Sequence, residues 1–171
     1  MQPFYPAAGT IRLSFANFRR FWAVAARVNS SCTPHGPRNR RRPSPRMRLR
    51  CANTAVDAVL QVFRRRLNAQ EGLEFASVLP SVLRAIFVHN WDVTEPRAEF
   101  YDREKLVSEV KAVRVNHNLT PDNAIEATAW AVRRSTNQRD FERVLAKLPA
   151  EARDFWHVDV VDPAELEQRI I

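Results

Sequence analysis

Glycine is nearly missing from this chain, which carries only Gly9, Gly36 and Gly72. Tight β-hairpin turns usually need glycine, because it adopts positive φ angles without a steric penalty. No glycine follows Gly72. We therefore do not expect a strand-rich fold after that position.

Apolar residues recur at helical spacing instead. One set falls at i, i+3, i+4, i+7 and i+11, the stripe of an amphipathic helix. Its members are Val56, Val59, Leu60, Phe63 and Leu67. A second stripe contains Leu106, Val110 and Val113, and Asp102 is the expected N-cap of that helix. These patterns predict an all-α fold.

Two more helix starts are marked by capping patterns. Residues 120–122 read Thr-Pro-Asp, which is a cap, then proline at the first helical position, then an acid that favours the helix dipole. We expect a helix from there to about Ser135. A pattern at 162–165 resembles a capping box and predicts a short C-terminal helix over 163–170.

An ungapped repeat with an offset of 69 residues relates two parts of the chain. Sliding 55–87 onto 124–156 gives eight identities, where about two are expected at typical residue frequencies. The identical pairs are Ala55/Ala124, Ala58/Ala127, Arg64/Arg133, Arg65/Arg134, Asn68/Asn137, Leu79/Leu148, Pro80/Pro149 and Arg84/Arg153. We predict a small helical bundle of two related helix–helix units, 55–91 and 102–157, produced by internal duplication.

Each unit would contain a helix, a polar break and a second helix that ends at a proline. The breaks fall at Asn68 and Asn137, and the prolines are Pro80 and Pro149. Proline ends one helix and suits the beginning of the next.

The first 50 residues differ in charge from the rest. They contain eleven arginines, no lysine and no acid, so they carry +11, and the remaining chain carries −3. We interpret 1–50 as a basic arm and 51–171 as the helical domain. Because like charges repel and prolines interrupt its second half, the arm is expected to be disordered, or at best locally helical around 11–28.

The arm has three interpretations. Arg40, Arg41 and Arg42 could contact nucleic-acid phosphates without reading sequence. The composition also suits a targeting peptide, although the apolar stretch is short and is interrupted by Arg27. Alternatively, a mistaken start site or reading frame has added the segment.

The repeat predicts that the first unit lacks an opening helix. The counterpart of the helix that begins near Asp102 would lie at 33–45, where four prolines and a glycine replace any apolar stripe. We therefore expect an uncovered apolar surface near Val59, Phe63 and Val82. Such surfaces usually find a partner, so we expect self-association.

The motifs of the two units resemble a known bacterial family. The runs LPSVLRAIFVHNWD, YDREKLVSEV, LTPDNAIEATAWAVRR and FERVLAKLPAEARDFW are similar to the domain of unknown function 2267, over about Ala55 to Trp156. The resemblance implies a helical fold and a prokaryotic cytoplasmic protein. It implies no reaction, cofactor or catalytic residue.

The chain has few residues arranged for chemistry. It contains no glycine-rich phosphate loop, and Cys32 and Cys51 are too isolated for paired metal-ligand spacing. We therefore expect no cofactor and no metal, and a reducing compartment. No run approaches the roughly 18 apolar residues of a membrane span.

One polar cluster and one basic cluster remain as candidate sites. The polar cluster is His89, Asn90, Trp91 and Asp92. The structural alternative is that the tryptophan anchors a loop to the core while its neighbours face water.

The basic cluster contains Arg64 and Arg65, which could bind phosphate. The alternative is that they cap the carbonyl end of the first helix, where cations are favoured. We expect Trp130 and Trp156 to be packing residues.

The leading functional hypothesis is a non-enzymatic helical module that binds another protein, or itself, through a groove between its two halves. A nucleic-acid-associated protein that uses the basic arm is the second hypothesis. An enzyme acting at the 89–92 loop is the third.

Overall fold

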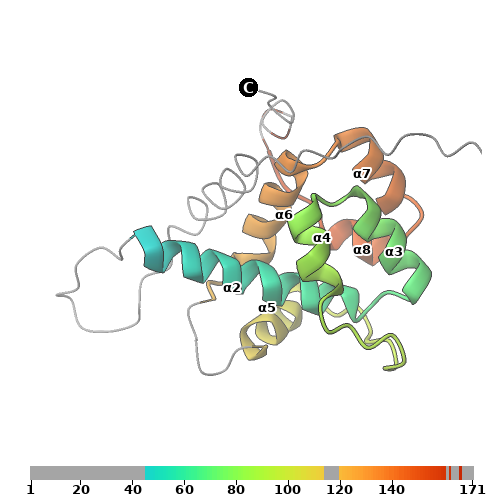
Figure 1. The fold of residues 1–171 in the computed structure, drawn as a ribbon, viewed down its shortest axis with the longest axis horizontal. Coiled ribbons are helices and arrows are strands. Elements are labelled where there is room, and N and C mark those ends of the chain that lie inside the picture. The colour runs from blue at the N-terminus through green and yellow to red at the C-terminus, as the bar shows by residue number, and fades with distance from the viewer. Residues whose placement is uncertain (1–44, 114–119, 161, 163–165, 167–171) are drawn as a thin grey trace, which may run out of the picture.

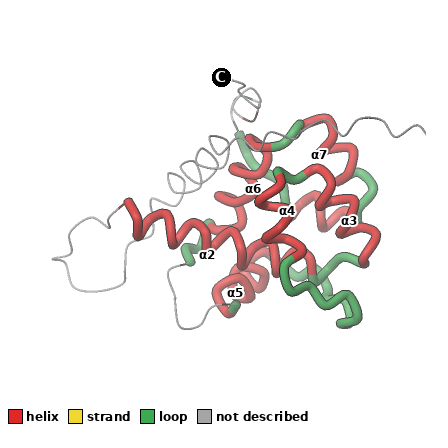
Figure 2. The backbone as a smooth tube through the Cα atoms, in the orientation of Figure 1, coloured by secondary structure: helices red, strands yellow, loops and turns green. Residues whose placement is uncertain are grey.

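The computed structural model describes residues 45–113, 120–160, 162 and 166. This part of the chain is helical and contains no strand (Figures 1 and 2), which confirms the all-α prediction. The helices are α2 (Pro45–Arg64), α3 (Ala69–Val78), α4 (Ser81–Val88), α5 (Arg103–Ala112), α6 (Ala124–Ser135), α7 (Gln138–Leu145) and α8 (Ala150–Phe155).

Helix α2 is the centre of the bundle. Helices α4, α5 and α6 pack against it, while α3 packs against α4 and α7. In Figure 1 the long α2 crosses the molecule, with α5 below it and the α3–α4 pair on the same side as α7 and α8. The first and second halves are therefore packed together rather than strung out.

The helix starts follow the local signals that the sequence carries. Asn68 caps α3 in a capping box with Glu71, and Asn137 caps α7 by accepting from the backbone N–H of Asp140. Pro80 and Pro149 occupy the N-cap positions of α4 and α8. Both asparagines and both prolines are separated by 69 residues, but the internal duplication itself stays a prediction.

Two predicted boundaries differ from the structure. Helix α6 begins at Ala124 rather than beside Thr120, because Pro121 and the two residues after it form a turn before the helix. Helix α2 begins at Pro45, so the last six residues of the predicted arm are its first turns. Arginine, methionine and leucine are good helix formers, which explains this upstream extension. Asp102 caps α5 as expected.

Several predictions fall outside the described residues. They concern the arm before residue 45, the lost helix at 33–45 except for its last residue, and the C-terminal helix over 163–170, of which only Leu166 is described. None of the described helices combines the length and apolarity that would let it cross a membrane.

The core between the two halves is aromatic. Its largest members are Phe63, Phe75, Phe87, Phe141, Phe155 and Trp156, all at most 2% exposed. Ring centroids of Phe63 and Phe75 from the first half lie 5.1 and 5.3 Å from that of Trp156 in the second. These rings fill the space in which we expected a binding groove between the halves.

The expectation of an uncovered surface on the first half is wrong for two of its three residues. Val59 and Phe63 are fully buried, because α5 and α6 pack against α2. Only Val82 remains partly exposed. The second unit therefore covers the part of α2 for which the sequence offered no cover.

Candidate functional site

The loop that follows α4 holds the four residues of the predicted polar site. Trp91 is half-buried, and its ring meets that of Phe87 edge-on at a centroid distance of 5.6 Å. His89, Asn90 and Asp92 are exposed. This arrangement is that of the structural alternative, in which the tryptophan anchors the loop and its neighbours face water.

Trp91 packs so closely on α3 that it requires a glycine there. A Cβ atom added to Gly72 would lie 2.0 Å from Cη2 and 2.3 Å from Cζ3 of Trp91. Gly72 is thus needed for close approach and not for a turn. The turn itself uses Asn90, at φ 52°, a conformation that asparagine tolerates better than most residues.

Arg64 holds this loop from inside the protein. Its Nη1 donates to the carbonyl oxygens of Phe87 and His89, both at 2.7 Å, and its Nη2 donates to that of Asn90 at 3.2 Å. Burial lowers the pKa of the Arg64 guanidinium. Arg64 therefore caps the carbonyl end of α4, and not that of its own helix, and its donors face away from any phosphate in solvent.

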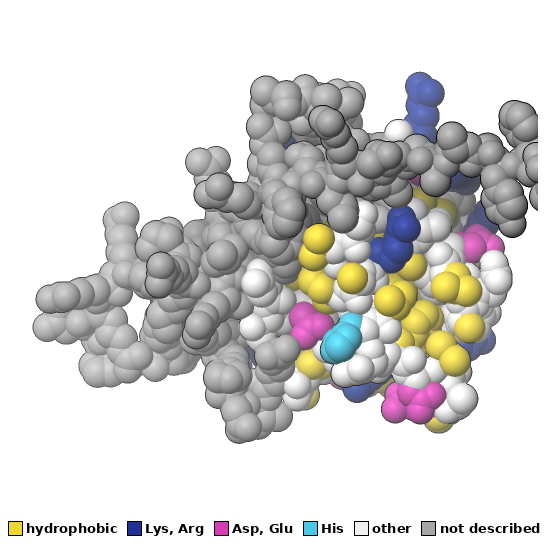
Figure 3. All heavy atoms as spheres, in the orientation of Figure 1, with side chains coloured by type: hydrophobic (Ala, Val, Ile, Leu, Met, Phe, Trp, Pro, Cys, Tyr) yellow, Lys and Arg dark blue, Asp and Glu magenta, His cyan; other side chains and the backbone are white. Residues whose placement is uncertain are grey.

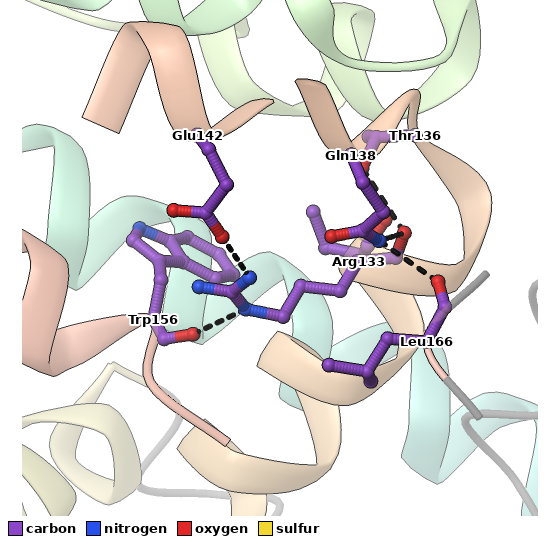
Figure 4. A network of polar contacts seen from close by, with 7 residues as sticks. Arg133, Thr136, Gln138, Glu142, Trp156 and Leu166 are labelled. Atoms are coloured by element: carbon purple, nitrogen blue, oxygen red, sulfur yellow. Dashed lines mark hydrogen bonds and ion pairs between the residues drawn. The ribbon is translucent and has the colours of Figure 1, made fainter. Parts of the chain in front are cut away.

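Arg133 makes the related contact in the second half (Figure 4). Its Nε donates to the carbonyl oxygen of Trp156 at 2.7 Å, and Trp156 lies 69 residues after Phe87. Its Nη1 also pairs with Glu142. Gln138 donates to the carbonyl oxygens of Arg133 and Leu166, which ties the start of α7 to the end of α6.

The remaining arginines of the basic cluster have different surroundings. Arg65 is exposed. Arg66 is buried and donates from Nη2 to both carboxylate oxygens of Glu109 at 2.9 and 2.8 Å, which fixes α5 to α2. The predicted phosphate contacts Arg40, Arg41 and Arg42 lie outside the described residues. The structure thus does not bring the candidate phosphate residues together as one described site.

The predicted packing roles of the two tryptophans are both seen. Trp156 is fully buried, and its indole N–H has no hydrogen-bond partner among the described residues. Trp130 is half-buried, with the guanidinium of Arg134 4.7 Å from its ring centroid. The described residues contain no group of three or more potential ligands that could hold a metal ion.

The surface of α3 and α4 is unusually apolar. Figure 3 shows hydrophobic side chains gathered on the side of the molecule that these two helices form. Leu73 on α3 is 60% exposed, Val88 at the end of α4 is 41% exposed, and Val93 in the next loop is 58% exposed. Val78, Val82 and Ile86 are partly buried beside them. We call these six residues, with Ala85 and Trp91, the α3–α4 patch.

The corresponding surface of α7 and α8 is charged. At an offset of 69 residues, five members of the α3–α4 patch correspond to charged or polar residues: Leu73/Glu142, Val78/Lys147, Val82/Glu151, Ala85/Asp154 and Val88/His157. Helices α7 and α8 fold with these polar side chains in place. The outer face of α3 and α4 is thus more apolar than the packing of such a helix pair requires.

Sequence reasoning missed the α3–α4 patch, although its signal was present. The repeat was examined for identities, and the patch appears only in the mismatches. An apolar residue opposite a charged one, at a position that is exposed in both halves, marks a surface and not a core position.

The electrostatic surroundings of the patch are mostly acidic. Glu74 pairs with Lys147 at 2.9 Å, and this hydrogen bond lowers the pKa of the Glu74 carboxyl. Hydrogen bonds from the hydroxyl and the backbone N–H of Thr94 lower the pKa of Asp92. Both carboxyls therefore remain charged to a lower pH than usual.

Comparison with known proteins places this architecture in a family. A family model described as "Uncharacterized conserved protein (DUF2267)" matches residues 46–155, which include all of α3 to α8 and nearly all of α2. No curated protein matches the chain.

Proposed function

The chain belongs to the DUF2267 family, and we propose that its helical domain is a non-enzymatic cytoplasmic module that binds another protein through the α3–α4 patch. The observation that carries this proposal is the contrast between the two halves. Residues that the fold leaves exposed are apolar on α3 and α4 and polar at the same register on α7 and α8. Contiguous exposed apolar side chains on a soluble protein commonly mark an interaction site.

The composition of the patch suits protein recognition. It combines an aromatic ring, Trp91, with the aliphatic side chains of Leu73, Val88 and Val93, all attached to helices or to a loop held by Arg64. Buried aromatic and aliphatic anchors on a rigid scaffold supply most of the affinity of protein interfaces. The surface is therefore ready to bind without prior rearrangement.

The polar cluster supports binding better than catalysis. Its histidine is exposed, and the carboxylate of Asp92 accepts hydrogen bonds from Thr94 within its own turn. A catalytic acid or base must be within hydrogen-bond reach of a partner that it serves. We assign these residues to the rim of the patch.

The proposal is tested by capture from an extract of the source cell. Three versions of the full chain serve as bait: the unaltered chain, the patch variant Leu73→Glu/Val88→Asp, and the control variant Ala146→Glu/Ala150→Glu. Ala146 and Ala150 are exposed on the second half, so the control adds the same charge there. We expect proteins captured by the unaltered chain and the control to be lost with the patch variant.

Equal capture by all three baits would contradict the proposal, provided that circular dichroism shows equal helix content. Sedimentation of the unaltered chain separates two kinds of partner. Dimers that the patch variant does not form would identify a second copy of the chain, and a monomer would leave a different protein as the partner.

A further inference from the structure

The chain's own N-terminal segment can reach the α3–α4 patch. Helix α2 begins at Pro45, and Arg64 near its other end holds the carbonyl groups that follow α4. A helix of this length spans about 30 Å. The 16 residues from 29 to 44 span at most about 50 Å when extended, so residues before 29 can return along α2 to the patch.

The sequence of this segment matches the apolar part of the patch. Between Ile11 and Val28, apolar residues recur at i, i+4, i+7 and i+11, which is the spacing of a helix stripe. They are Ile11, Phe15, Phe18 and Trp22. An amphipathic helix laid on an apolar surface is a common form of protein recognition.

The charges of the two surfaces are opposite. Residues 1–44 contain eight arginines and no acid. Residues 69–99, which form the patch and its surroundings, contain five acids and two arginines.

Neither of these two arginines offsets the acids freely. Arg84 donates to the carbonyl oxygens of Ala76, Ser77 and Leu79, and Arg97 pairs with Glu71 at 3.3 Å. Charge complementarity of this kind favours the docking of the basic segment over that of an acidic one.

We propose that the segment from Ile11 to Val28 docks on the α3–α4 patch of its own chain and thereby competes with the protein partner. This inference rests on the proposed function, because it assigns an internal competitor to the same surface. The apolar stripe covers Leu73, Trp91 and Val88, and the arginines of the segment face the acidic surroundings.

Limited trypsin digestion of the full chain, followed by intact-mass spectrometry, tests the docking. Cleavage tracks the population of the open form. Arg40, in the linker, is cut first, and Arg20, inside the docked segment, is cut at least about tenfold more slowly. In the patch variant Leu73→Glu/Val88→Asp, Arg20 is cut as fast as Arg40. In the control variant Ala146→Glu/Ala150→Glu, Arg20 stays protected.

Three results overturn the docking proposal. Cleavage at Arg20 as fast as at Arg40 in the unaltered chain is the first. Protection that persists in the patch variant is the second. Protection that disappears on tenfold dilution is the third, because it would assign the segment to a second copy.

The two proposals fail separately. If trypsin overturns docking while the patch variant still loses its captured proteins, the patch binds a protein and has no internal competitor. If capture is equal for all baits, the proposed function falls whatever trypsin shows.

Discussion

At the scale of single residues, two buried arginines organise the ends of equivalent helices. Arg64 and Arg133 lie near the ends of α2 and α6, and each donates to the carbonyl group of the aromatic residue 69 positions apart, Phe87 or Trp156. A carbonyl left without a donor at a buried helix end is costly. These arginines therefore serve the fold, and their repeated presence needs no ligand.

The first prediction concerns Arg64. Arg64→Met should lower the free energy of unfolding by about 2–3 kcal/mol, because a charged donor is lost and the buried carbonyl group of Phe87 is left unpaired. Urea denaturation followed by circular dichroism measures this change. Arg65→Met is the matched control, since Arg65 is exposed, and it should change stability by less than about 0.5 kcal/mol. Equal losses for the two variants would contradict the capping role.

The second prediction concerns Gly72. Alanine normally stabilises a helix interior by about 1 kcal/mol relative to glycine. Gly72→Ala should instead destabilise the protein by about 1–2 kcal/mol, because its Cβ would displace the ring of Trp91. In a Trp91→Ala background the same change should be stabilising. A gain in stability in the unaltered background would show that the ring does not need this glycine.

At the scale of helices, α4 and α8 are the informative pair. Both follow a proline, and both bury an inner face, with Leu83 and Phe87 on α4 and Ala152 and Phe155 on α8. Their outer faces differ, since α4 is apolar where α8 carries Glu151 and Asp154. Helix α4 therefore separates residues that hold the fold from residues available for binding.

The third prediction follows from the two faces of α4. Leu83→Ala, on the inner face, should cost about 2–5 kcal/mol of unfolding free energy, because it leaves a cavity. Val88→Asp, on the outer face, should change stability by less than about 0.5 kcal/mol. Thermal and urea unfolding of the two variants measure the difference. A loss above about 2 kcal/mol for Val88→Asp would place its side chain in the core and remove it from the patch.

At the scale of the whole molecule, the parts of the fold set by local signals could be predicted. The asparagine caps and the two prolines mark helix boundaries through contacts with their own neighbours, so Asn68, Asn137, Pro80 and Pro149 appear at the expected places. Residue periodicity likewise predicts helices without knowledge of their partners.

Features set by tertiary contacts could not be predicted in the same way. The acceptors of Arg64 lie 23 to 26 residues further along the chain, so its role depends on how α2 and α4 pack. The expected exposure of Val59 and Phe63 was wrong because the sequence did not reveal that α5 and α6 pack against α2. The α3–α4 patch could have been inferred from the mismatches of the repeat.

The central claim, that the α3–α4 patch contacts another protein, is tested most directly by photo-crosslinking of the full chain in its source cell. A photoreactive phenylalanine analogue is placed at Val88 and, in a second version of the chain, at Ala146, both of which are exposed. We predict that irradiation joins a protein to position 88 and not to position 146, with the adducts identified by mass spectrometry. Adducts of equal yield at both positions, or at 146 alone, would contradict the claim.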